Sequence, residues 1–295
     1  MSPATGYSAP KTYKTCLTYK DGFRGGTYVT IYGGNATAKA EKLAQAALTR
    51  AKKTLHLFNL GTYTEVSQEI LGSGSQFGEA RASNEVVMKL AVKHPEAKAV
   101  GIFLKELAGI GLATPPGLSG FTGGGRARPS PVVRLFSYKT DKTAVTARID
   151  IDGKIQEHQD YILHDQDKFS KETTPTKISD ADTQVPLIKL AWGRSGDKGD
   201  KANIGLIARK ADYLPYIWAA LTTDKIGEVY QHFTDAPKAI ERFYLPGSHA
   251  MNILIDNVLG GGGAASLRND AQAKGYAQIL LAQSIPVSKA IAKSL

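Results

Sequence analysis

The chain of 295 residues mixes stretches in which every second residue is apolar with stretches that have a helical repeat. A two-residue alternation rich in Thr, Tyr, Val and Ile predicts β-strands. In the first half of the chain these strands lie at 14–19, 27–32, 64–71, 132–136, 144–151 and 154–163. The first two flank a glycine-rich stretch, 20–26, which predicts a β-hairpin. The dipeptide Asp152-Gly153 predicts the turn of a second hairpin.

Helical periodicity is clearest from Ala36 onward, where apolar residues recur on one stripe and Lys and Arg lie opposite. Gly61 ends this pattern. Two further helices are predicted at 83–94 and 96–107. The segment 108–131 is too rich in Gly and Pro for a helix or a strand, so we expect a long loop there.

The second half of the chain follows a polar stretch, 164–184, whose Asp, Lys, Thr and Ser residues are typical of a linker. Strands are predicted at 186–192, 202–208, 241–245 and 265–269, with 194–201 as a loop. Helical segments are predicted at 213–233, 247–259 and 276–284. We therefore predict an α+β protein with two units, 1–163 and 185–295. Each has a mixed or antiparallel sheet with helices on one face.

The composition narrows the class of protein without naming its function. Apolar residues make up 42% of the chain and charged residues 22%, which is typical of a globular protein. The formal charge of +10 favours anionic partners. However, the lysines are scattered, and basic and aromatic residues do not interleave in one patch, so we expect no nucleic acid. Neither a strand–GxGxxG–helix nor a Walker sequence occurs, so we expect no nucleotide fold.

The cysteine and histidine content indicates which disulfides and metal sites are possible, and the lengths of the apolar runs indicate whether the chain can cross a membrane. The single cysteine, Cys16, excludes an intramolecular disulfide, and the six histidines lack metal-ligand spacing. No apolar run reaches the length of about 18 residues that is needed to cross a bilayer. The first residues lack the features of a signal peptide. We expect a soluble cytoplasmic protein with no metal site and no membrane partner; a mitochondrial location stays open for a eukaryotic source.

The most distinctive polar segment, 194–203, lies between two apolar strands. Gly196 and Gly199 permit backbone conformations in which several N–H groups converge. The candidate catalytic residues are Asp197, Lys198 and Asp200, and the candidate binding residues are Arg194, Ser195 and Asn203. An ordinary charged turn is the alternative. The S-x-x-K spacing of serine acyl enzymes is also present, but it needs a helix start, against which two glycines argue.

Two further glycine-rich segments carry basic residues. Ordering the four glycines at 260–263 costs more backbone entropy than ordering other residues, so a close approach to a ligand or another chain would explain them. The segment 120–134 combines glycines with several arginines, which suits a diphosphate or a carboxylate. The candidate binding residues of these segments are Gly261, Gly262, Ser266, Arg268 and Arg134. Flexible or exposed basic loops are the alternatives.

Two C-terminal motifs resemble a known family. The sequences RSGDKGDKANIGLIAR, residues 194–209, and YLPGSHAMNILIDNVLGGGGAASLRNDAQAKGYAQILL, residues 244–281, resemble the C-terminal, ferredoxin-like domain of the acyclic terpene utilisation (AtuA) family. The stretches TYKDGFRGGTYVTIYGG, 18–34, and RPSPVVRLFS, 128–137, resemble the end of the family's large first domain. Family members carry a longer first domain. We therefore expect a C-terminal fragment, a cleavage product or one of two split subunits.

The resemblance implies a role in the catabolism of acyclic terpenes and branched acids as acyl-CoA thioesters, beside biotin-dependent carboxylases. It points to the motif positions named above and assigns them no mechanism, and it indicates no cofactor. Two interpretations stay open. One is an enzyme or enzyme subunit, for instance a hydro-lyase that adds or removes water on a branched acyl-CoA or carboxylate ligand. The other is a non-catalytic subunit that binds a partner chain. A homo-oligomer, or a second chain that supplies the rest of the first domain, is expected.

Overall fold

The computed structural model describes residues 9–120, 126–160, 175, 178–234 and 239–295. The chain divides into two compact units. The first comprises Met1–Tyr19 and Leu135–Thr173, and the second comprises Lys20–Arg134 and Thr174–Leu295. The long strands β1 (Thr12–Tyr32) and β5 (Ser130–Asp141) pair with each other and contribute residues to both units. Most of the expected linker, 164–184, lies outside the described residues, so the expected domain limits stay predictions.

The described part of the first unit is a two-stranded ribbon followed by a hairpin. In the ribbon, residues 12–19 of β1 lie beside residues 135–141 of β5. The hairpin pairs β6 (Ala147–Ile151) with β7 (Lys154–His158), which confirms the hairpin that the Asp-Gly turn predicted.

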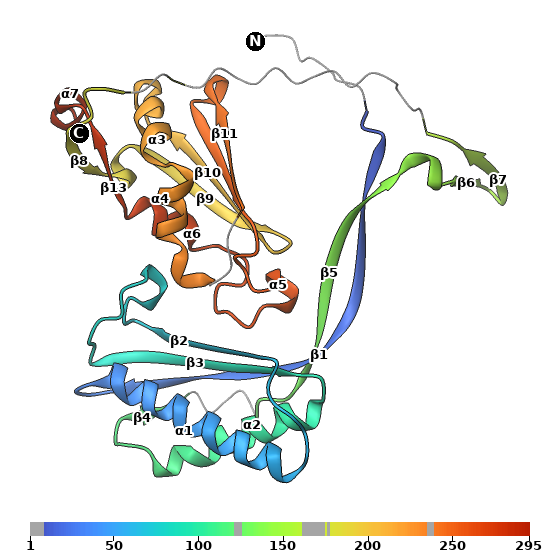
Figure 1. Ribbon diagram of the computed structural model, residues 1–295, viewed down its shortest axis with the longest axis vertical. Helices are drawn as coiled ribbons and strands as arrows, with labels where there is room; N and C mark the ends of the chain where they lie inside the picture. The colour runs from blue at the N-terminus through green and yellow to red at the C-terminus, as the bar shows by residue number, and fades with distance from the viewer. Residues whose placement is uncertain (1–8, 121–125, 161–174, 176–177, 235–238) are drawn as a thin grey trace. The chain divides into compact units, whose positions relative to one another are not determined.

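The first sheet of the second unit has the strand order β2-β3-β1-β4, with β5 also paired to β1 (Figure 1). The other elements of this region are β2 (Glu65–Leu71), β3 (Glu85–His94), β4 (Leu118–Ser119), α1 (Ala36–Leu57) and α2 (Ala97–Ile110). Both helices cover the same face of the sheet. The face of α1 that points to the sheet is mostly alanine, so the helix can approach the strands closely and fill the interior without voids. The predictions of α1, β2 and α2 are confirmed.

The prediction of a hairpin loop at 20–26 is wrong, because β1 continues through this stretch and pairs with β3 from Phe23 onward. Two glycines make this possible. A Cβ on Gly25 would lie 2.6 Å from Val100 Cγ1 of α2, and a Cβ on Gly26 would lie 2.6 Å from Ala91 Cβ of β3. The glycines therefore serve the close approach of a helix and a neighbouring strand, and they do not make a turn.

The prediction of a helix at 83–94 is also wrong, because residues 85–94 form the central strand β3. This strand is buried on both faces, so its apolar residues follow one another without alternation. Such a run fits a buried strand as well as a helix. Two lysines of β3, Lys89 and Lys93, are buried as well, at 5% and 7% exposure.

The C-terminal half of the second unit contains a four-stranded antiparallel sheet in the order β11-β12-β10-β9. Its strands are β9 (Ala191–Lys198), β10 (Lys201–Ala208), β11 (Ile240–Leu245) and β12 (Ala250–Ile255). The helices of this half are α3 (Leu214–Ala220), α4 (Thr223–Val229), α5 (Gly262–Ala265), α6 (Tyr276–Leu281) and α7 (Lys289–Lys293). A small sheet pairs β8 (Thr183–Pro186) with β13 (Ser284–Val287).

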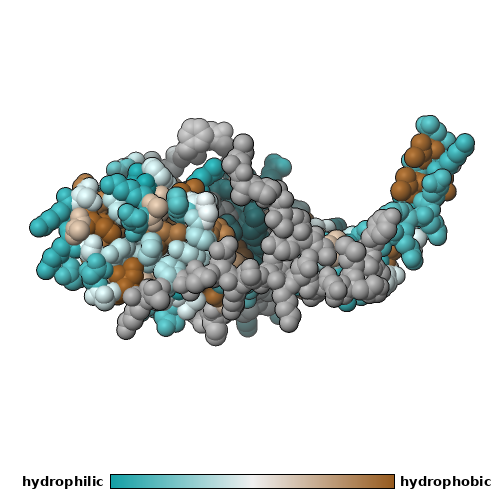
Figure 2. All heavy atoms as spheres, turned by 90° about the horizontal axis from the view of Figure 1, so that it is seen from above, coloured by the Kyte–Doolittle hydropathy of each residue, from teal (hydrophilic) through white to brown (hydrophobic). Residues whose placement is uncertain are grey.

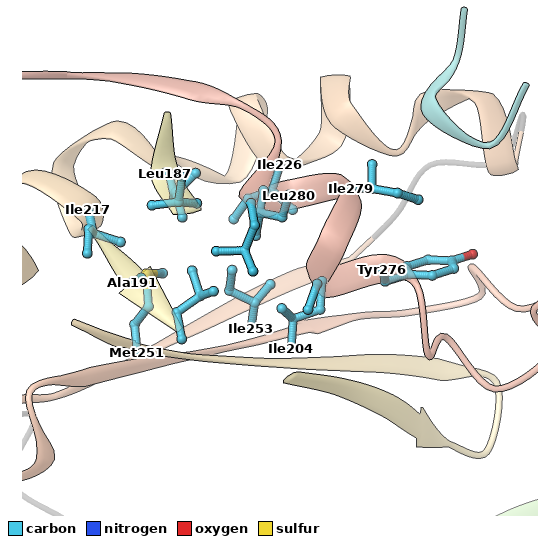
Figure 3. Close-up of a cluster of buried hydrophobic side chains, with 14 of the residues drawn as sticks. Leu187, Ala191, Ile204, Ile217, Ile226, Met251, Ile253, Tyr276, Ile279 and Leu280 are labelled. Carbon is cyan, nitrogen blue, oxygen red and sulfur yellow. The ribbon is translucent and has the colours of Figure 1, made fainter. Parts of the chain in front are cut away.

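A hydrophobic core fills the space between this sheet and its helices (Figure 3). Ile204, Met251 and Ile253 enter it from β10 and β12, and Ile217 and Leu280 enter from α3 and α6. All five side chains are buried, so one face of the sheet is covered by helices. The prediction of an α+β fold with helices on one face of antiparallel sheets is confirmed.

Three local predictions in this half are wrong. The segment 247–259 contains strand β12 and no α-helix, and 265–269 is not a strand. Residues 194–198 belong to β9, so the expected loop shrinks to the tight turn between β9 and β10. In β12, Met251, Ile253 and Ile255 point into the core in a two-residue alternation. Ala250 and Leu254 on the other face of the strand make this pattern ambiguous in the sequence.

Candidate functional site

The β9–β10 turn and the glycine segment 260–263 are held together by one carboxylate. Asp200 Oδ1 accepts hydrogen bonds from the backbone N–H of Gly261 at 2.8 Å and of Leu259 at 3.2 Å. The Asp200 carbonyl also accepts from Val258 N at 3.3 Å. A carboxylate that receives several backbone donors is a strong anchor. The sequence placed Asp200 among the candidate catalytic residues, and the structure uses it to anchor the glycine segment.

The glycines of this segment are required by backbone geometry. Gly260, Gly261 and Gly262 have φ angles of 65°, 98° and 75°, in the left-handed region that other residues rarely adopt. A Cβ on Gly262 would lie 2.3 Å from the carbonyl oxygen of Gly199 in the facing turn. The sequence predicted a close approach of this backbone to a ligand or another chain. The approach observed is to the β9–β10 turn of the same chain.

Two other candidate residues are also engaged within the protein. Ser195 Oγ accepts from Ala277 N at 2.8 Å, at the start of α6. The Arg268 guanidinium donates to the backbone carbonyls of Val258 and Phe233, and it lies 5.5 Å from the centre of the Phe233 ring. These contacts fix α6 and the segment that follows the glycines.

The remaining candidates of the β9–β10 hairpin are divided between the two faces of its sheet. Side chains alternate along a strand, so Arg194 and Lys198 point to the face opposite that of Ser195 and Asp197. Asn203 shares the face of Arg194, since it pairs with Gly196. The structure therefore separates Arg194 and Lys198 from Asp197, and it places the S-x-x-K pair on opposite faces of a strand.

Asp197 lies against the glycine segment. Its Oδ2 is 3.5 Å from the position that a Cβ would take on Gly263. The Lys274 Nζ lies 3.5 Å from the equivalent position on Gly196, the residue before Asp197. Lys274 was not a candidate in the sequence, because a single lysine after the glycine segment carries no motif.

A buried charged layer on β2 and β3 was also missed in the sequence. Lys89 Nζ donates to Glu69 Oε2 at 2.7 Å and to Ser67 Oγ at 2.9 Å. Burial lowers the pKa of Lys89, and the Glu69 carboxylate opposes that change. The signal was a spacing of four residues on both strands: Lys89 and Lys93 of β3 face Glu69 and Glu65 of β2. The prediction of a helix at 83–94 obscured this pattern, because it placed the two lysines outside any strand.

The second ion cluster of this layer contains the candidate Arg134. Asp21 pairs with both Lys93 and Arg134, and Arg134 also lies 3.9 Å from Glu65. The hydrogen bond from Lys93, followed by that from Arg134, holds the pKa of Asp21 below its ordinary value despite partial burial. The Arg134 Nη1 is 3.2 Å from the position of a Cβ on Gly261, so the structure brings Arg134 and the glycine segment together.

The segment after the glycines lies on this charged layer. Arg24 Nη1 donates to the Ser266 carbonyl at 2.8 Å, and the Tyr28 hydroxyl donates to Asn269 Oδ1 at 3.1 Å. The Asn269 N–H donates to Glu69 Oε2 at 2.7 Å. Each contact joins the first sheet of the second unit to the segment 266–269 of the same unit.

Two cavities open beside this segment. The smaller, of about 350 Å³, has the basic side chains Arg24, Lys89, Arg128 and Arg268 in its lining, and none of its described lining residues is acidic. We call it the basic groove. The larger, of about 590 Å³, is lined by Gln76, Phe77, Gly263, Asn269, Asp270, Ala271, Gln272, Lys274, Gly275, Gln278 and Ile279. Gly263 and Ala271 line both, so the two cavities adjoin.

Among the residues that the structure describes, no group of three or more His, Cys, Asp and Glu side chains is arranged to hold a metal ion. No helix in the same residues is both long enough and apolar enough to cross a membrane.

Comparison with family models gives two matches. Residues 1–151, slightly more than half of the chain, match the acyclic terpene utilisation family protein AtuA. Residues 185–286 match the AtuA ferredoxin-like domain, which contains the four-stranded sheet and the glycine segment. No curated protein and no solved structure matched the chain. The two family matches together span both halves of the chain, and the protein therefore belongs to the acyclic terpene utilisation (AtuA) family, whose members take part in acyclic terpene utilisation.

Proposed function

We propose that the protein is an enzyme, or a subunit of one, that binds a branched acyl-CoA or the corresponding free carboxylate in the basic groove and the adjoining cavity. The observation that carries the proposal is the lining of the groove, which brings four basic side chains together. Lys89 is paired with Glu69 and Arg268 donates to backbone carbonyls, so Arg24 and Arg128 are the groups proposed to bind the ligand. Guanidinium groups suit phosphate and carboxylate, since they donate paired hydrogen bonds. The family's role in acyclic terpene utilisation supports a branched acid as the substrate class.

The two cavities suit the two parts of such a ligand. The groove would hold the phosphates or the carboxylate, near Arg24 and Arg128. The larger cavity contains Phe77 and Ile279 among its lining residues and adjoins the groove at Gly263, so it would hold the branched acyl chain. Apolar cavities with a few polar groups are the usual form of small-molecule sites.

Asp197 is the residue that we propose for proton transfer. Its carboxylate lies beside Gly263, which lines both cavities, and among the described residues no backbone N–H donates to it as those of Gly261 and Leu259 donate to Asp200. In a dehydration, Asp197 would take the proton next to the thioester carbonyl and deliver it to the β-hydroxyl, which would leave as water. In a hydration, Asp197 would take a proton from the water that adds to the β-carbon and return it to the carbon next to the carbonyl. Lys274 lies beside the same strand and could neutralise charge on the carbonyl oxygen.

Thermal denaturation with a branched acyl-CoA tests the binding step. A ligand that binds only the folded state stabilises it by about 2.7 kcal/mol at 100 times its Kd. For a chain of this size the melting temperature should rise by roughly 5 °C or more. Arg128→Gln removes a basic side chain of the groove, and the shift should shrink. Arg148→Gln is the matched control, since Arg148 is exposed on β6.

Turnover tests the catalytic step. Asp197→Asn should abolish turnover of an active substrate while the thermal shift is kept, and Lys198→Ala should change neither by much, because Lys198 is exposed on the other face of its strand. Equal turnover in Asp197→Asn and the parent chain would exclude Asp197 as the proton-transfer residue.

A second candidate function is a non-catalytic subunit, which the hydrogen bonds of the site favour. Asp200, Ser195 and Arg268 all bind backbone groups of the protein itself. A site that serves only to join segments would have these contacts and no turnover. A binding shift without turnover, in the presence of every substrate tested, would support this function over the enzyme.

A further inference from the structure

The ribbon of the first unit has one apolar face. Thr15 Oγ1 lies 2.7 Å from Thr140 Oγ1, and Cys16 Sγ lies 3.4 Å from Ser137 Oγ. Each contact joins side chains of the two facing strands, so Thr15 and Thr140 share one face of the ribbon. Successive side chains of a strand point to opposite faces, so Cys16 and Ser137 belong to the face opposite the one that contains the two threonines.

Four large side chains occupy the threonine face. Leu17 and Tyr19 lie on the face of Thr15, Phe136 and Tyr138 lie on the face of Thr140, and the Phe136 and Tyr138 rings stack at 5.9 Å. We call these four residues the ribbon face. Each is between 44% and 56% exposed, although large apolar side chains normally lie in a core.

An isolated two-stranded ribbon is marginally stable in water, and it becomes stable when its apolar face packs on another layer. The adjoining hairpin of β6 and β7 also has exposed apolar side chains. In Figure 2 brown apolar atoms are visible on the hairpin at the right of the view, and Ile149, Ile151 and Ile155 are all exposed.

A second uncovered apolar face lies on the four-stranded sheet. The strand registers place Trp192, Ile207, Ala250 and Leu245 in one row across all four strands. This row points away from the helices, because the neighbouring Leu206 and Met251 point into the core. We use the name sheet face for its exposed large residues together with the next one on β11: Trp192, Ile207, Phe243 and Leu245. Each is between 39% and 53% exposed.

A glycine leaves open space in the middle of the sheet face, where an aromatic ring of another chain would fit. Gly205 of β10 lies in the middle of it, between Arg194 of β9 and Asn252 of β12. A Cβ on Gly205 would find only Asn252 Oδ1 at 3.8 Å and the Arg194 carbonyl oxygen at 4.0 Å. Nothing in the described part of the same chain fills this space, and a glycine in a central strand often marks a close approach of another group.

The areas of the two faces decide between possible dimers. With about 200 Å² for a large apolar side chain, the ribbon face exposes roughly 400 Å² and the sheet face roughly 370 Å². A dimer through two ribbon faces, or through two sheet faces, would bury about 800 Å² in total, below the roughly 1,200 Å² of a stable interface. A reciprocal dimer that uses both faces of both copies would bury about 1,500 Å², within the usual range.

We propose that the protein forms a reciprocal two-fold dimer, in which the ribbon face of each copy packs on the sheet face of the other. Face-to-face packing of two sheets is a common way to bury alternating apolar side chains. A two-fold axis repeats the same contact twice, which doubles the buried area without a second kind of interface. This inference concerns assembly and does not rest on the proposed ligand or reaction.

The molar mass in solution is the first test. The full chain should sediment at twice 31.6 kDa. Tyr19→Glu, which places a charge on the ribbon face, should weaken the dimer by at least tenfold. Thr18→Glu is the matched control, because Thr18 is the exposed neighbour on the opposite face of β1 and its variant should stay dimeric. Gly205→Gln fills open space on the sheet face and should weaken the dimer as Tyr19→Glu does.

Disulfide trapping identifies which faces meet. In a Cys16→Ser background, one preparation carries Leu17→Cys and the other carries Ile207→Cys, so a bond between them must join two copies. The proposal expects a disulfide-linked species when the two preparations are mixed under oxidation, and little linkage in either alone.

Any of three results would overturn the proposal. The first is a monomer at every concentration tested for the unmodified chain. The second is a dimer in which Leu17→Cys links to itself and not to Ile207→Cys, since that pattern joins two ribbon faces. A dimer that survives both Tyr19→Glu and Gly205→Gln unchanged would likewise exclude these faces.

Discussion

The two large antiparallel sheets of the second unit differ in the face that carries no helices. Each has helices on one face. On the sheet of β1, β2 and β3, the other face carries buried charges, and the segment after the glycines lies on it. On the sheet of β9 to β12, the other face carries exposed apolar residues and the described chain leaves it uncovered.

The difference shows that the role of a charged or an apolar side chain depends on whether the chain covers it. Charged groups such as Lys89 and Glu69 enter the interior of the first sheet region because each finds an opposite charge and hydrogen bonds. Apolar groups such as Trp192 and Ile207 stay about half exposed on the second sheet, although the Arg209 guanidinium lies 4.6 Å from the centre of the Trp192 ring. A buried charge therefore marks a built internal contact, and an exposed apolar row marks a surface for another chain.

The largest expected effect comes from breaking the buried ion pair. Glu69→Leu leaves Lys89, whose side chain is 7% exposed, without its carboxylate, and the free energy of unfolding should fall by about 3–5 kcal/mol. The double variant Glu69→Leu with Lys89→Met should recover much of the loss, because no unpaired charge remains. Urea unfolding measures both. Equal stability of the single variant and the parent chain would contradict the buried pairing.

A matched pair on strand β10 compares the two faces of the second sheet. Ile204 is fully buried and Ile207 is 51% exposed, three residues apart on the same strand. Ile204→Ala should reduce the free energy of unfolding by about 2–5 kcal/mol, since it leaves a cavity. Ile207→Ala should change it by about 0.5 kcal/mol or less when measured on the monomer. Similar losses at both positions would show that Ile207 is covered within one chain.

The smallest effect is a change in the acid limb of the stability curve. Lys93 and Arg134 hold the pKa of Asp21 below its ordinary value, so Asp21 contributes stability above the carboxyl pKa of about 4, and this contribution is lost as the pH falls below it. Asp21→Asn should therefore flatten the loss of stability between about pH 4 and pH 2. Asp212→Asn, at an exposed position, is the control. An unchanged acid limb in Asp21→Asn would remove Asp21 from the pairing.

The candidate site was predicted in part. Sequence alone indicated the glycine segment, Arg134 and Asp197, and the structure places these close to one another. It gave no sign that Asp200 anchors the glycine backbone, because that role depends on donors about 60 residues further along the chain. Nor did it indicate Lys89 or Lys274. A lysine becomes informative only when its burial and its partner are known.

By itself the sequence determined the fold class, the alanine-striped helix α1 and most of the amphipathic elements, because these depend on local periodicity. It also determined the family, through long motifs that resemble those of its members. Only the tertiary structure decided that 85–94 and 250–255 are strands and that β1 runs through its glycines. An apolar run buried on both faces has no readable period, and a glycine needed for close packing looks like a glycine in a turn. Such residues take their conformation from neighbours that are distant in the chain.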